Sequence, residues 1–122
     1  MCEVRELRAI LVGASPFLAD LIRRVAEARL RSAGVSLEVV AEFADSEDAR
    51  RQLGGRAADI AIFGGARETP APIEGWSAPM LGLSADLSLI FGPGPSDIAR
   101  LTPENLAARL VKFSRTRGSL LY

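Results

Sequence analysis

The sequence predicts an α/β fold in a single domain, residues 1–122. The stretch from Arg8 to Ala33 has the pattern of a buried strand, a tight turn and a long amphipathic helix. Apolar strand segments and capped helical segments then alternate along the chain, which is typical of α/β proteins. The chain has 122 residues, 48% of them hydrophobic, so it is long enough and apolar enough for one globular core.

The opening unit begins with a strand over residues 9–12, a short apolar run of the kind found in strands covered on both faces. Gly13 and Ala14 form the turn. Ser15 is a good N-cap, and Pro16 suits the first helical position, which needs no N–H partner. Apolar residues then recur every three or four positions, which predicts one helix stripe packed against a sheet. The stripe contains Leu18, Leu21, Ile22 and Val25.

The middle of the chain continues the alternation. We expect a second strand over Ser36–Phe43 and then a helix over residues 45–53, whose acidic first turn suits the helix dipole. A third strand, apolar throughout, is expected over Ala58–Phe63, and Gly64-Gly65 closes it.

The segment over residues 66–78 differs from the rest because its prolines do not allow an ordinary helix. Ile73 and Trp76 are its only large apolar side chains. We expect an irregular crossover loop that these two side chains attach to the body of the protein. A mobile surface loop is the alternative interpretation.

Two short strands are expected next, over Met80–Leu83 and Leu87–Phe91. Only Ser84-Ala85-Asp86 lies between them, whereas a parallel neighbour needs a crossover of a dozen or more residues. The two segments therefore form a hairpin, or one of them is not a regular strand. A rigid turn follows at residues 92–95. Thr102 and Pro103 then begin a last helix, and residues from about 115 to 122 are expected to form a tail.

Composition argues against several classes of function. There is no histidine, the commonest general base and metal ligand, and Cys2 is the only cysteine. We therefore expect no catalytic residues, no metal site and no cofactor. The formal net charge is +0, and the helical arginines are interspersed with acids, which gives no basis for nucleic-acid binding. No apolar run approaches the ~20 residues of a membrane span, and the N-terminus lacks a signal-peptide core, so we expect a cytoplasmic protein.

One turn could bind an anion. Gly13, Ala14 and Ser15 lie where a strand passes into a helix, and free N–H groups at a helix N-terminus attract negative charge. Ser84, at the end of the fourth expected strand, is a further candidate for this site. A full dinucleotide fingerprint would need more glycines than this turn has, so a plain capped turn is the competing interpretation.

The order of these elements resembles the receiver domain of bacterial response regulators. The resemblance lies in the opening unit, ILVGASPFLADLIRRVAE, in Phe91-Gly92-Pro93, where the family has lysine-proline, and in Ser84, where it has threonine or serine. It implies a flavodoxin-like, doubly wound, mostly parallel sheet of four to five strands. It also implies three main helices, with the third and fourth helices of a receiver reduced or missing.

The reactive groups of that family are absent at the matching positions. Gly13 and Ala14 stand where the family has its Mg²⁺-binding acidic pair, Phe63-Gly64-Gly65 stands where it has the aspartate that accepts phosphate, and Gly92 replaces its lysine. Without metal ligands or an acceptor, Mg²⁺-assisted phosphoryl transfer cannot proceed. The resemblance therefore implies a non-catalytic pseudo-receiver that is not phosphorylated on aspartate.

The missing helices would leave part of an apolar sheet face bare, and an exposed apolar face of several hundred Å² usually marks an interface. We therefore expect a protein-interaction or dimerisation module in bacterial signalling. Its partner would be a second copy, a signalling protein or an assembly protein. The expected interaction surface consists of Ile73, Trp76, Met80, Leu87, Leu89 and Phe91. The alternative is a domain that binds a small anion or nucleotide at the Gly13–Ser15 turn.

Overall fold

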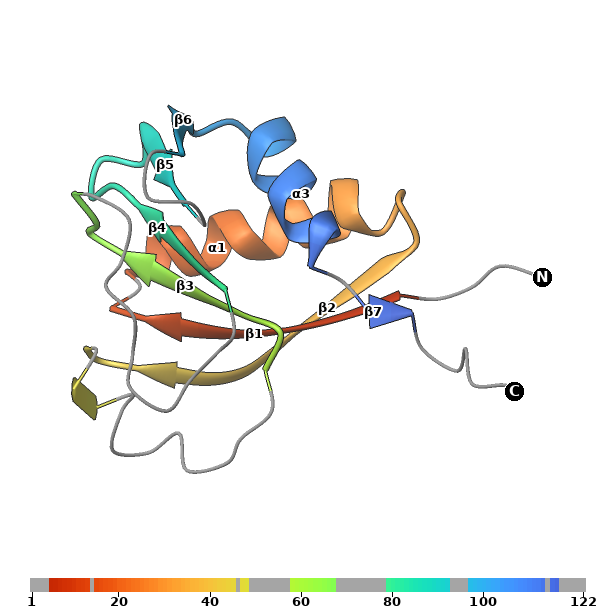
Figure 1. The fold of residues 1–122 in the computed structure, drawn as a ribbon, viewed down its shortest axis with the longest axis horizontal. Coiled ribbons are helices and arrows are strands. Elements are labelled where there is room, and N and C mark those ends of the chain that lie inside the picture. Colours follow the sequence, from red (N-terminus) through yellow and green to blue (C-terminus); the bar gives the residue numbers. More distant parts are fainter. Residues whose placement is uncertain are drawn as a thin grey trace.

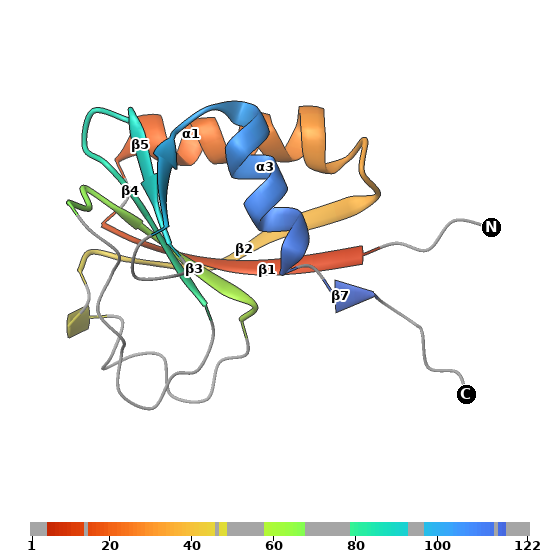
Figure 2. The same ribbon diagram turned by 45° about the horizontal axis from the view of Figure 1, so that its top comes forward.

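The computed structural model describes seven stretches of the chain, and the structural statements below refer to them. They are residues 5–13, 15–45, 47–48, 58–67, 79–92, 97–113 and 115–116. Within these stretches the protein forms one twisted sheet with its long helices packed against a single face (Figures 1 and 2).

The sheet of the described residues has seven strands. Six of them follow the order β2-β1-β3-β4-β5-β6. The seventh, β7, is not part of this order and pairs with the start of β1. The pairs β1–β2, β1–β3 and β3–β4 are parallel, whereas β4–β5, β5–β6 and β1–β7 are antiparallel. The strands are β1 (Arg5–Val12), β2 (Val35–Phe43), β3 (Ile60–Gly64), β4 (Met80–Leu83), β5 (Leu89–Phe91), β6 (Ile98–Arg100) and β7 (Arg115–Thr116).

The predicted fold class is wrong. A flavodoxin-like, doubly wound, mostly parallel sheet of four to five strands would carry helices on both faces. Instead the sheet is mixed, and the two long helices of the described residues lie on the same face (Figure 2). These helices are α1 (Pro16–Val25), which a π-helical turn η1 (Ala26–Leu30) continues, and α3 (Pro103–Lys112). The third predicted helix, over residues 45–53, lies mostly outside the described residues. Within this range, the structure describes Glu47 and Asp48 as helical.

The connection between β4 and β5 explains the difference. It is a tight hairpin, which settles the alternative that the sequence left open. The Ser84 N–H donates to the Leu89 carbonyl at 3.0 Å, and the Leu87 N–H donates to the Ser84 carbonyl at 2.9 Å. Leu87 has a φ of 59°, a left-handed conformation that is uncommon for a side chain of this size. Its side chain packs against the main core, which offsets the strain of that conformation.

Both helices begin as the sequence predicts. The Ser15 Oγ accepts a hydrogen bond from the Leu18 N–H at 3.2 Å, and the Thr102 Oγ1 accepts one from the Asn105 N–H at 3.0 Å. Each cap satisfies one of the N–H groups that a helix leaves free at its start. The apolar stripes of the two helices then pack against one face of the sheet. This main core includes Leu7, Leu11, Leu18, Ile22, Ile62, Leu81, Leu106 and Leu110, each at most 2% exposed.

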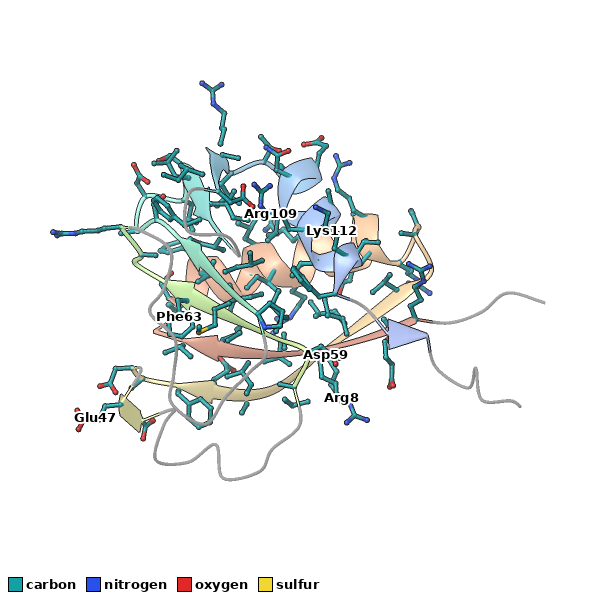
Figure 3. All side chains as sticks on the ribbon, viewed as in Figure 1. Arg8, Glu47, Asp59, Phe63, Arg109 and Lys112 are labelled. Atoms are coloured by element: carbon teal, nitrogen blue, oxygen red, sulfur yellow. The ribbon has the colours of Figure 1, made fainter. Side chains whose placement is uncertain are left out.

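The opposite face of the sheet is also buried. Ile10, Val12, Phe43, Ala61 and Phe63 form a second apolar cluster there, and each is at most 8% exposed within the single chain. Figure 3 labels Phe63 in this region. The bare sheet face that the sequence suggested is therefore not found at these residues.

Several predicted features lie outside the described residues. They are the loop over residues 68–78 with Ile73 and Trp76, the turn residues 93–95, and the tail beyond Thr116. The short strands β6 and β7 were not predicted, and β7 falls in the segment expected as a tail. Arg115 and Thr116 pair with Glu6 and Arg5, so the chain returns after α3 to the strand with which the sheet begins.

Polar contacts join the helices to the strand connections. Arg109 on α3 donates from Nε to the Gly92 carbonyl at 3.2 Å and from Nη2 to Asp97 Oδ1 at 2.7 Å (Figure 3). These two bonds hold both ends of the β5–β6 connection against α3. Arg29 of η1 donates to Glu104 Oε1 of α3 at 2.8 Å, which links the two helical segments on this face of the sheet.

The backbones of Gly13 and Gly64 approach each other closely. A Cβ atom at Gly64 would lie 2.6 Å from the Gly13 carbonyl oxygen and 3.0 Å from the Leu18 Cδ2. We expect Gly64→Ala to destabilise the protein by about 2 to 3 kcal/mol because the two strand ends must separate. Chemical denaturation measures this difference in the free energy of unfolding.

Gly65→Ala is the matched control. Gly65 has a φ of +67°, but a Cβ there would meet nothing within 4 Å. Alanine at this position should therefore cost only the left-handed strain, about 1 kcal/mol. The close approach would be contradicted if Gly64→Ala lost no more free energy of unfolding than Gly65→Ala.

Candidate functional site

The parallel strands bring the predicted anion-binding residues to one edge of the sheet. Val12 pairs with Phe63 across β1–β3, and Gly64 pairs with Leu83 across β3–β4, so the carboxyl ends of three strands lie in one row. Ser84 follows directly after this row. Since neighbouring strands are about 4.8 Å apart, Ser84 lies two strands, or about 10 Å, from the turn after β1. Ala14 lies outside the described residues.

The groups at this turn are already engaged. Gly13 has a φ of +64° and donates its N–H to the Phe43 carbonyl at 2.9 Å. The Ser15 hydroxyl caps α1, and the Gly64 backbone lies against the Gly13 carbonyl. These contacts account for Gly13 and Ser15 as parts of a capped strand-to-helix turn.

Ser84 belongs to a hydrogen-bond network within the β4–β5 hairpin. Its Oγ accepts from the N–H groups of Ser88 and Leu89, at 3.0 and 2.9 Å, and donates to Asp86 Oδ1 at 2.8 Å. The same Asp86 oxygen accepts from the Ser88 hydroxyl at 2.6 Å and from the Ser88 N–H at 3.1 Å. Hydrogen bonds from Ser88, and then from Ser84, hold the pKa of Asp86 below its usual value.

A carboxylate beside Ser84 disfavours an anion at that hydroxyl, because like charges repel. The structure thus separates the described residues of the predicted anion site, Gly13 and Ser15 in a capped turn and Ser84 in a hairpin network. Anion binding at the Gly13–Ser15 turn stays a prediction. Among the described residues there is no group of three or more Cys, Asp or Glu side chains that could hold a metal ion.

The residues of the predicted interaction surface have different environments. Phe91 is buried, Met80 and Leu87 are half-buried against the two cores, and only Leu89 is exposed among the members that the structure describes. The pairing of β5 and β6 places Ile98, which is 58% exposed, opposite Phe91. Leu89 and Ile98 therefore form a small apolar patch on the outer face of this hairpin.

A larger feature lies at the other end of the sheet, between α1 and the edge strand β2. It is a cleft of about 290 Å³. Its walls combine buried apolar side chains from the sheet and helix with charged side chains at the rim, and Val39 within it is 41% exposed. We call it the β2 groove. It is lined by Leu11, Ala19, Ile22, Arg23, Glu27, Leu37, Val39 and Glu42.

A β-bulge in β2 shapes this groove. Ala9 pairs with Val39 but Ile10 pairs with Ala41, so Val40 is an extra residue in β2. The extra residue reverses the alternation of side chains, which puts Glu42 on the groove side of the sheet. Without the bulge, Val39 and Glu42 would point to opposite faces.

The outer edge of β2 has no strand partner in the part of the chain that is described, since β2 pairs with β1 alone. Every second residue of an edge strand directs its N–H and C=O groups away from the sheet. The straight part of this edge, Val35–Val39, precedes the bulge and is about 17 Å long. The β2 groove therefore lies beside a row of backbone groups able to bond an added strand.

Sequence reasoning missed this groove. Nothing in the sequence singles out Arg23 and Glu27 among the interspersed helical charges, or Val39 within the second expected strand. The only signal in the sequence is the incomplete alternation of β2, where Val39 and Val40 are adjacent apolar residues. A bulge in a strand breaks alternation in this way, but the sequence does not say which strand lies at the edge.

Comparisons with known proteins add no relative: no family model matches the chain, and no match was found among curated proteins or solved structures. In the part of the chain that the structure describes, no helix has both the length and the hydrophobicity needed to cross a bilayer. The function must therefore be argued from the geometry of the chain itself.

The hairpin network predicts a pH dependence of stability. The Asp86 carboxylate is better stabilised in the folded than in the unfolded chain. Its contribution is complete above the pKa of an unfolded aspartate, about 3.9, and is lost as pH falls through the lower folded-state pKa. We expect Asp86→Asn, which keeps the side-chain size, to lose less stability than the wild type as pH falls below about 4.

Denaturant titrations at pH steps between 6 and about 2 measure this effect. The loss of stability at low pH will not vanish in Asp86→Asn, because Glu104 also has a lowered pKa. Hydrogen bonding of Glu104 to its own backbone and the charge of Arg29 cause this lowering. The hydrogen-bond network would be contradicted if the free energy of unfolding fell equally with pH in the variant and in the wild type.

Proposed function

We propose that this chain is a non-catalytic protein-interaction domain of the cytoplasm. In this proposal an extended segment of a partner protein adds as a strand to β2 and places side chains in the β2 groove. The observation that carries the proposal is the position of a cleft of about 290 Å³ next to a strand edge that has no strand partner among the described residues. Strand addition supplies main-chain hydrogen bonds, and an adjacent cleft supplies side-chain specificity.

A peptide suits this site better than a small apolar ligand. A small ligand could fill the cleft between Leu37 and Ile22, but it would leave the N–H and C=O groups of the β2 edge bonded only to water. An extended peptide contacts both the edge and the cleft. The straight edge of five residues, Val35–Val39, is as long as a typical strand.

A second copy of the chain is the other candidate partner, and the exposed Leu89 and Ile98 favour it. These two side chains lie on the outer face of the β5–β6 hairpin, 39% and 58% exposed. Strand β6 has only three residues, so its edge offers less backbone pairing than that of β2. We therefore rank self-association through this patch second.

Two matched variants test the proposal. Val39→Lys puts an ammonium group into the β2 groove, and Ile98→Lys makes the same change at an exposed apolar residue at the opposite end of the sheet. Peptides are first selected against the wild type from a random nine-residue library. We expect Val39→Lys to weaken their binding at least tenfold, about 1.4 kcal/mol, and Ile98→Lys to leave it unchanged.

Calorimetry of the selected peptides with the three proteins gives the affinities. The proposal fails if no peptide binds the wild type, or if Val39→Lys binds as tightly as the wild type. Loss of binding in Ile98→Lys alone would move the interaction to the β5–β6 patch. Sedimentation of the wild type and Ile98→Lys at micromolar concentration tests self-association through that patch.

A further inference from the structure

The rim of the β2 groove has charged side chains without partners. Arg23, Glu27 and Glu42 line the cleft, and none of them forms an ion pair with another described residue. Other charged side chains nearby are paired: Arg24 bonds to Asp20 at 2.9 Å, and Arg29 of η1 bonds to Glu104. The rim therefore has one positive and two negative charges that are free to meet a partner.

Two local irregularities create this arrangement. Arg23 and Glu27 are four residues apart, a spacing that favours an ion pair in a regular α-helix. Here α1 passes into the π-helical turn η1 at Ala26, and the wider turn changes the angular spacing between them. On the strand side, the bulge at Val40 brings Glu42 to the same cleft. Both irregularities favour the same outcome, which is unpaired charge around an apolar floor.

A strand that covers this cleft removes water from Glu27 and Glu42. An unpaired carboxylate that loses its water is costly, so a purely apolar segment would bind poorly here. Cations on the partner would restore the lost interactions and add charge-assisted hydrogen bonds. The acidic excess therefore favours arginine or lysine in the bound segment.

The same charges disfavour a second copy of β2 as the occupant. Strand β2, VSLEVVAEF, contains Glu38 and Glu42 but no lysine or arginine, so a second β2 would bring no cation to the rim. Self-pairing at this edge would thus add carboxylates to a rim that already has an excess of them.

We infer that the β2 groove binds an extended basic segment of another protein, in which the side chains that face the groove include both apolar residues and arginine or lysine. This inference rests on the function proposed above and specifies the chemistry of the partner. Every second side chain of a strand points to the same face. The apolar side chains that face the groove enter the cleft over Leu37 and Val39, and the basic ones on that same face reach Glu27 and Glu42 at the rim.

Three defined heptapeptides test the inference. All have valine at positions 3 and 5 and serine at positions 2, 4 and 6, and positions 1 and 7, which share the face of the valines, are both arginine, both serine or both glutamate. Exposed ion pairs contribute little individually, so two pairs predict a preference of about two- to thirtyfold for arginine over serine. The glutamate peptide should bind most weakly. The preference should decrease as salt rises, because ions screen exposed charges.

A charge-reversed variant provides the control for specificity. In the double variant Glu27→Arg, Glu42→Arg, the glutamate peptide should become the tightest ligand. Asp20→Arg changes a charge on α1 outside the cleft lining and should leave the original ranking intact.

The possible outcomes separate the two proposals. Arginine preference that reverses in the double variant supports the inference. Equal binding of the three peptides, abolished by Val39→Lys, overturns the inference but leaves strand addition at β2 standing. Binding of none of them, together with an empty library selection, overturns both.

Discussion

The connection between β4 and β5 is the constraint on which the rest of the architecture depends. Five residues, Ser84–Ser88, join the two strands, and a parallel crossover would need at least twice as many. The chain must therefore reverse, so β5 and then β6 run antiparallel. The serine and aspartate side chains of the hairpin satisfy the backbone of this reversal. After β6, α3 packs on the same face as α1, and β2 remains at the edge of the sheet.

The sequence predicted the elements better than their arrangement. Strands β1, β3 and β4 and the starts of both helices follow from local apolar runs and from the caps Ser15 and Thr102, which local chemistry decides. Strand β6 was missed because three residues with one large apolar side chain give no pattern to detect. The doubly wound architecture came from a resemblance, although the short Ser84–Asp86 link already allowed the hairpin that excludes a fifth parallel strand.

The β2 groove could not be predicted because it depends on three facts of tertiary structure. One is that β2 lies at the edge, another is the bulge at Val40, and the last is the π-helical turn after Val25. None of these has a reliable local signal. Together they place an apolar floor side by side with charges and a backbone edge that have no partner among the described residues. The groups of the predicted anion site, by contrast, bond mainly to their own turns.

Amide hydrogen exchange at β2 tests the central claim most directly. Amides of Val35–Val39 that point away from β1 exchange with solvent in the free protein if the edge is unpaired. On saturation with a selected peptide, the account predicts that these outward amides become protected while those of β5 and β6 do not change. Protection confined to Leu89–Arg100, or unchanged exchange along β2 in the saturated complex, would contradict strand addition at this edge.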